Sequence, residues 1–203
     1  WTGTTTSSGE SVAVVNTLPY QGTYHVRFTS DDDAEADYAS CYRTIDEEEV
    51  WASGHFYVAS GLPLENDDER FYFIHFTSGR NYLAGVGIRR HEGSDKWVLY
   101  GRNGSGWVGP IYSMSPVIEM NRWYCVELHW KKHATHGVLE AFVDGERILL
   151  IEDIDTARLG NVSEINFGLT LALQVQKKLD IYGDCFAFSD VYVGSYALGD
   201  INH

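Results

Sequence analysis

Histidines, aromatic residues and neutral polar residues recur at alternate positions in four segments of this chain, 50–60, 70–77, 122–132 and 164–173. Alternate residues of a β-strand lie on one face of its sheet, so each segment pairs an aliphatic face with an aromatic and polar one. Such a face predicts a groove that stacks sugar rings and bonds their hydroxyls, and a sheet face covered by loops is the alternative. The expected ligand-binding residues are His55, Tyr57, His75, Arg89, Trp97, Trp107, Trp123, Glu127, His129 and Asn166.

Catalysis on a polysaccharide would need particular pairs of groups. A lyase needs one group that neutralises a uronate carboxylate and another that removes the neighbouring proton, and His, Asn, Arg and Tyr can do both. A retaining hydrolase needs two carboxylates flanking the scissile bond. Glu127 has no acidic partner on its own strand, and Glu47-Glu48-Glu49 falls in a predicted turn. A hydrolase is therefore not expected, and no residue is assigned as catalytic.

The elements that must position these residues are short strands joined by Gly-rich and Asp-rich turns. Asp144-Gly145 between two alternating apolar runs is a strong hairpin signal, because both turn positions need positive φ. Gly85, Gly87 and Gly101 fall inside strand segments, where glycine indicates a bulge, a bend or close approach of a ligand. The expected strands are 12–15, 22–29, 38–45, 50–60, 70–77, 82–90, 96–102, 122–132, 138–143, 146–151, 164–173 and 185–193.

Helix signals are nearly absent, apart from a short turn at 155–159 that ends at Gly160. About 12 short strands at this spacing predict an all-β, two-sheet antiparallel sandwich. At 203 residues, the chain is expected to form a single domain over residues 1–203. Cys41, Cys125 and Cys185 show no metal-binding spacing, and either one disulfide with a free thiol or three thiols is compatible with them.

Several segments resemble modules of the concanavalin A-like (laminin G-like) jelly-roll superfamily. They are Trp1-Thr-Gly-Thr, Tyr20-Gln-Gly-Thr-Tyr-His-Val-Arg-Phe, Trp123-Tyr-Cys-Val-Glu-Leu-His-Trp, Phe142-Val-Asp-Gly, Ile165-Asn-Phe-Gly-Leu and Cys185-Phe-Ala-Phe-Ser-Asp-Val-Tyr-Val. The resemblance spans nearly the whole chain and implies a jelly-roll sandwich. Members include lectins, carbohydrate-binding modules, hydrolases, lyases and surface proteins, so the resemblance predicts the fold better than any one activity.

The resemblance also implies a metal and leaves some motifs unmatched. Many members bind Ca²⁺ near the first and last strands, which here implies Asp31, Asp33, Asp184 and Asp190 as metal ligands; a solvated acidic turn also explains residues 31–37. The acidic strand motif of the hydrolases is absent. Of the alginate-lyase motifs, only Phe73-Ile-His75 resembles the Gln-Ile-His segment. Similar modules carry a strand before the Trp-x-Gly segment, and its absence here predicts an open sheet edge that a second copy could fill by strand addition.

The net charge of −14 argues against nucleic acid and anionic membranes as partners, because phosphate groups would be repelled. No apolar run is long enough to predict a membrane span. The chain begins at Trp1 rather than Met, which suggests a processed or excised module, and we expect an extracellular or cell-surface location.

Three functions follow in order of preference. The first is a lectin-like domain that binds a polysaccharide or other glycan and that Ca²⁺ could stabilise. The second is a structural subunit that assembles with itself by strand addition and Ca²⁺ bridging. The third is a polysaccharide lyase.

Overall fold

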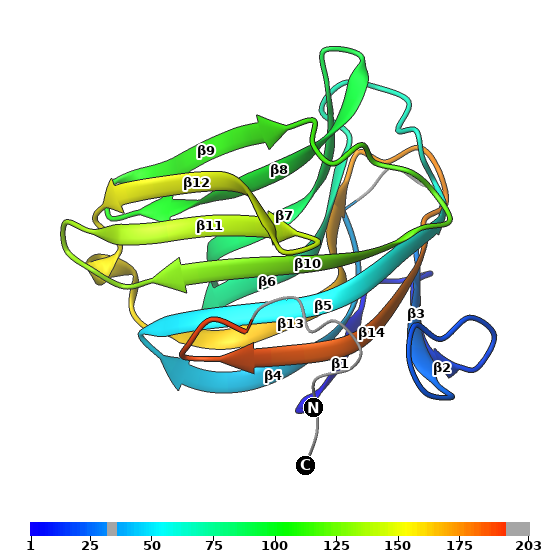
Figure 1. Cartoon of the computed structure of the whole chain (residues 1–203), viewed down its shortest axis with the longest axis horizontal. Coiled ribbons are helices and arrows are strands. Elements are labelled where there is room, and N and C mark those ends of the chain that lie inside the picture. Colours follow the sequence, from blue (N-terminus) through cyan, green and yellow to red (C-terminus); the bar gives the residue numbers. More distant parts are fainter. Residues whose placement is uncertain (32–35, 194–203) are drawn as a thin grey trace.

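The computed structural model describes residues 1–31 and 36–193, which form two seven-stranded antiparallel sheets lying one over the other (Figure 1). Sheet A has, in spatial order, β1 (Gly3–Thr6), β4 (Ala36–Glu47), β13 (Val162–Leu173), β6 (Arg70–Ser78), β7 (Asn81–His91), β8 (Ser94–Asn103) and β9 (Gly106–Ser113). Sheet B has β12 (Glu146–Ile154), β11 (Gly137–Val143), β10 (Trp123–Lys131), β5 (Glu49–Ser60), β14 (Asp180–Ser189), β3 (His25–Thr29) and β2 (Ser11–Val15).

This architecture confirms the all-β sandwich expected from the sequence, with fourteen strands among the described residues instead of about twelve. The two strands not expected are β1 and β9. Strand β1 is a run of Thr with no apolar alternation, and β9 is interrupted by Gly109-Pro110. The turn near residue 155 is a 3₁₀-helix, Ala157–Leu159, followed by Gly160 at φ 85°. None of the described helices is long and apolar enough to cross a bilayer.

The predicted hairpin joins β11 to β12, and its geometry has a local cause. Asp144 and Gly145 have φ values of 53° and 82°, which is the pair of positive values that a two-residue turn matching the strand twist requires. Arg122 also donates to the Asp144 carboxylate over 2.8 Å, and Cys125 N donates to its other oxygen over 2.9 Å. The turn is therefore tied to the start of β10.

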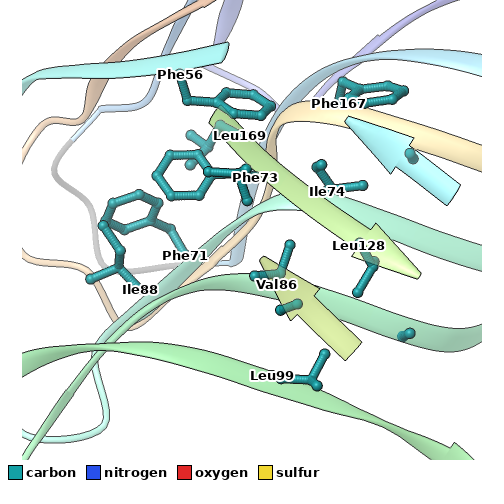
Figure 2. Packing of buried hydrophobic residues seen from close by; sticks show 14 of the residues in the cluster. Phe56, Phe71, Phe73, Ile74, Val86, Ile88, Leu99, Leu128, Phe167 and Leu169 are labelled. Atoms are coloured by element: carbon teal, nitrogen blue, oxygen red, sulfur yellow. The ribbon is translucent and has the colours of Figure 1, made fainter. Parts of the chain in front are cut away.

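The core lies between the sheets and is built from the inward faces of both. Figure 2 shows Phe56, Phe73 and Phe167 packed among aliphatic side chains, and all three are essentially inaccessible to solvent. A ligand is expected on an outward face of a sheet, because side chains there can contact it. We call the face of each sheet directed away from this core its outer face.

Two β-bulges change which residues reach the outer face of sheet A. The β6–β7 register shifts between Tyr72 and Ile74, and the β13–β6 register shifts between Phe167 and Leu171. A bulge adds a residue to one strand and re-aims the side chains that follow it. Phe71, Phe73 and Ile74 all enter the core, so His75 does not share a face with the phenylalanines, as strict alternation predicted.

The three cysteines are free thiols, which settles the alternatives left open by their spacing. Cys41 and Cys125 are buried and Cys185 is exposed. Burial raises the pKa of the Cys125 thiol to about 11.

Candidate functional site

A cavity of about 310 Å³ opens on the outer face of sheet A. Both charged and aromatic side chains line it, together with aliphatic ones. Its lining residues are Arg70, Tyr72, Tyr82, Arg89, Tyr100, Trp107, Val108, Gly109, Pro110, Leu171 and Leu173.

Three cations of this face form one row across three neighbouring strands. Arg70 of β6 lies directly opposite Arg89 of β7, which in turn lies opposite Lys96 of β8. Like charges placed directly opposite destabilise a sheet, so the row costs folding free energy unless anions compensate it. Asp68 compensates part of the charge: its carboxylate accepts from Arg89, and its carbonyl accepts from Arg70 Nη1 over 2.8 Å. Lys96 pairs with Glu92 over 3.1 Å.

A second row of the same face brings an imidazole to a phenol. His75 of β6 lies opposite Gly85 of β7, and Gly85 lies opposite Tyr100 of β8. The His75 Nε2 atom and the Tyr100 hydroxyl are hydrogen-bonded to each other above the glycine. A Cβ atom at Gly85 would lie 2.7 Å from His75 Nε2 and 2.8 Å from Tyr100 Cε1. Only glycine at this position lets the two side chains meet.

Burial controls the protonation of this pair. It lowers the pKa of the His75 imidazole to about 3, so the ring is neutral near neutral pH. Burial, together with the neighbouring Tyr72 and Tyr82 phenols, raises the pKa of Tyr100 well above its ordinary value, and the Arg70 charge opposes that rise. Tyr100 therefore holds its proton in the free protein, with a neutral nitrogen beside it.

Aromatic side chains border the pair. The Tyr82 ring lies 4.4 Å from the His75 ring, and the Trp107 ring lies 5.4 Å from that of Tyr100. Trp107 is 58% exposed, and the Arg102 guanidinium lies 5.0 Å from its ring centroid. An exposed indole held in this way offers a flat surface to a sugar ring at one end of the cavity.

The structure places four of the residues selected from sequence around this site. Arg89 and Trp107 line the cavity. His75 lies beneath it, and Asn166 of β13 lies opposite His75 and donates to Glu164 over 2.9 Å. The expectation for Trp97 is corrected: its ring is fully buried between the sheets, and its indole N–H donates to Pro116 O over 2.8 Å, so no ligand can reach it.

The other selected residues lie on the outer face of sheet B, on the opposite side of the molecule. They are His55, Tyr57, Trp123, Glu127 and His129. The single groove expected for the selected residues is therefore wrong, because His55 and His129 belong to sheet B and His75 to sheet A. His55 and His129 are also covered.

Their contacts on sheet B show how they are covered. The Tyr20 ring stacks on His55 at 3.9 Å. His129 stacks on Trp51 at 3.7 Å and bonds to Glu49 over 3.0 Å and to Glu140 over 2.8 Å. These contacts cover both imidazoles, so His55 and His129 are closed to a ligand.

Sequence reasoning missed the residues that give the cavity its charge and its phenols, namely Arg70, Tyr72, Tyr82 and Tyr100. The available signal was the pair Gly85 and Gly87 at alternate positions of one strand. Two glycines on one face leave a hollow between the neighbouring strands. The side chains of those strands that border the hollow are then candidates to line a binding site.

Three carboxylates form a separate cluster, where the segments before β2 and after β3 meet the start of β4. Oxygen atoms of Glu10, Asp31 and Asp37 lie within 4.8 Å of one another and could hold a cation. Asp31 was an expected metal ligand, and Asp33 lies outside the described residues. Asp184 and Asp190, the other expected ligands, are not in this cluster. One carboxylate oxygen of Asp184 instead accepts from Tyr20 N over 3.1 Å and from Gln21 N over 3.0 Å.

No protein-family model and no curated protein sequence matches the chain. Solved structures do match it at low identity. A β-1,4-glucuronan lyase from the fungus Trichoderma reesei has 12% identity and a TM-score of 0.69, over 93% of this chain and 90% of that one. The cellulose-induced protein Cip1 has 12% identity and a TM-score of 0.66, over 92% and 88%. The alginate lyase vAL-1 from Chlorella virus has 14% identity and a TM-score of 0.62, over 89% of each chain. These likenesses confirm the concanavalin A-like jelly-roll fold.

Proposed function

We propose that this protein binds an acidic polysaccharide in the sheet A cavity and cleaves it by β-elimination. The observation that carries the proposal is the placement of Arg70 and Arg89 in the same cavity as Tyr100, whose hydroxyl is hydrogen-bonded to the buried His75. A uronate-cleaving site needs positive charge for the carboxylate and a proton-transfer group for the adjacent carbon. Several proteins of similar fold are described as glucuronan or alginate lyases, which agrees with this assignment.

The local charge supports an anionic ligand in spite of the net charge of −14. A polyanion would be repelled by the protein as a whole, so a cluster of cations on one face has to overcome that field at short range. Arg70 and Arg89 are both half-buried and face the same cavity. Their guanidinium groups can bind a planar carboxylate through paired N–H donors.

The elimination can be written with the residues of the cavity. The Tyr100 oxygen accepts the proton on C5 of the uronate while its own proton moves to His75 Nε2. The electron pair of the C5–H bond forms the C4=C5 double bond, and the C4–O glycosidic bond breaks. Tyr100 then protonates the leaving oxygen and recovers a proton from His75. Arg70 and Arg89 stabilise the negative charge that develops on the carboxylate.

A second candidate is binding without cleavage, and one observation favours it. Burial makes His75 a weak base, with a pKa lowered to about 3, and Tyr100 holds its proton. A site of this kind recognises a uronate but transfers protons slowly, unless the bound substrate changes the two pKa values.

The test is incubation with glucuronan, alginate and pectate, with the ultraviolet absorbance of unsaturated uronate ends as readout. Lyase activity that disappears in Tyr100→Phe, with binding retained, supports the first candidate. Binding by the unmodified protein without product supports the second. Neither binding nor product with any acidic polymer contradicts both.

The acidic cluster is best suited to Ca²⁺. Glu10, Asp31 and Asp37 supply only oxygen atoms, which are the ligands that Ca²⁺ prefers, and Asp37 is buried. We propose that Ca²⁺ joins the 9–10 and 31 turns to the start of β4. A polysaccharide ligand also favours the extracellular location expected from the sequence.

A further inference from the structure

Two leucines of β13 reach the outer face of sheet A because of a bulge. The β13 register shifts between Phe167 and Leu171 against β6, and Gly168 has a φ of 117°, which L side chains rarely adopt. Leu169 and Ala172 are fully buried in the core, whereas Leu171 and Leu173 are half-buried and line the cavity. A β-bulge next to a binding site is a common device for re-aiming side chains.

These leucines adjoin the carboxylate-binding arginine. Leu173 lies directly opposite Arg70, and Leu171 lies opposite Tyr72. Neighbouring strands are about 4.8 Å apart, which is close to the width of one sugar ring. A uronate whose carboxylate meets Arg70 therefore has another of its ring positions over the leucines.

Another apolar group lies at this cavity. Pro110 of β9 lines it together with the leucines of β13. A bare sugar hydroxyl placed against these side chains loses its water and gains no hydrogen-bond partner from them, which costs free energy. The methyl group of an acetyl ester at the same place gains free energy from burial.

We propose that the preferred substrate is an O-acetylated polyuronate, in which Arg70 and Arg89 take the carboxylate and Leu171 and Leu173 take the acetyl methyl group. This inference rests on the proposed function of the same cavity. A methyl ester of the carboxylate would not serve, because it would remove the charge that the two arginines recognise. The substituent must be apolar and the acid must stay free.

The experiment compares one acetylated glucuronan with the same polymer after mild alkaline deacetylation, so that chain length and sugar are matched. Both kcat/KM for unsaturated ends and Kd are measured for the unmodified protein and for Leu171→Thr and Leu173→Thr. We expect a preference of about tenfold for the acetylated polymer, falling toward one in either variant. Val14→Thr is the matched control, since Val14 is 72% exposed on β2 of the other sheet. Circular dichroism checks that each variant is folded.

The outcomes separate this inference from the proposed function. Equal or better use of the deacetylated polymer overturns the acetyl preference and leaves the polyuronate site standing. A preference that survives both leucine variants also overturns the assignment of the methyl group to β13. Failure to bind or cleave either polymer overturns the proposed function together with the inference.

Discussion

Arg70 of β6 and Arg89 of β7 occupy directly opposing positions in an antiparallel pair, with Lys96 of β8 next in the same row. Such a row is unfavourable unless anions lie beside it, and Asp68 and Glu92 supply two carboxylates for the three cations. The row therefore keeps an excess of positive charge on one face of an otherwise acidic molecule, which an anionic ligand would compensate. Sites that bind often retain features that lower stability.

The first prediction concerns Arg70, whose Nη1 atom donates to the Asp68 carbonyl over 2.8 Å. Arg70→Gln should raise the free energy of unfolding by about 0.5 kcal/mol, because it removes a like-charge contact with Arg89. The same change should weaken binding of a polyuronate at least tenfold. Urea unfolding and calorimetric titration measure the two effects. A variant that is both less stable and equally able to bind would contradict this reading of the row.

The second prediction concerns pH and His75. Its folded-state pKa is lowered from 6.5 to about 3 by burial, so the unfolded chain binds more protons between these values and acid favours unfolding. Stability from the neutral imidazole is fully present above 6.5 and is lost as the pH falls toward 3, at about 1.4 kcal/mol per pH unit in that window.

The measurement is the free energy of unfolding as a function of pH for the unmodified protein and for His75→Gln. The variant lacks the titrating ring, so its profile should be flatter below 6.5. His136→Gln is a suitable control, because His136 lies in an exposed loop where it bonds to Asp153. Identical slopes for the unmodified protein and His75→Gln would show that His75 is not buried in its neutral form.

The third prediction concerns Gly85. Gly85→Ala places a Cβ atom against His75 and Tyr100, so it should separate the pair and cost about 1–3 kcal/mol of stability. Activity on a polyuronate should fall more than binding does, since the arginines are not touched. Gly79→Asn serves as the control, because that turn position is open and its φ of 58° is one that Asn tolerates. Full activity in Gly85→Ala would rule out a role for the His75–Tyr100 contact.

The fourth prediction concerns the acidic cluster. Ca²⁺ at 100 times its Kd should stabilise the protein by about 2.7 kcal/mol, and a chelator should reverse the effect. Asp37→Asn should abolish the response, while Asp153→Asn, which changes an exposed acid outside the cluster, should leave it intact. Thermal unfolding with and without Ca²⁺ gives the answer. A shift of equal size in Asp37→Asn would place the ion elsewhere.

Local sequence patterns predicted the parts of this fold that have local causes. The Asp144-Gly145 turn is an example, because the φ values it needs depend on those two residues alone. The inward face of β10 followed equally well, since Tyr124, Val126, Leu128 and Trp130 alternate without interruption and all lie in the core.

The site was harder to predict because it depends on which sheet a strand joins and on single-residue bulges. His55 and His75 have similar surroundings in the sequence, but β5 lies in sheet B and β6 in sheet A. The bulge after Tyr72 then reverses the alternation that would have placed His75 with the phenylalanines. Nothing in the residue pattern of 70–77 signals that extra residue, so Tyr100 and Arg70 could not be joined to His75 from sequence.

The most direct test of the polyuronate site is calorimetric binding of glucuronan oligosaccharides to Tyr100→Phe, a variant chosen so that cleavage does not consume the ligand. Binding should weaken with salt and fall at least tenfold when Arg70→Gln and Arg89→Gln are added. No change is expected when Arg27→Gln is added instead, since Arg27 pairs with Asp180 on sheet B. No measurable binding, or an equal loss from the Arg27 change, would contradict the proposed site.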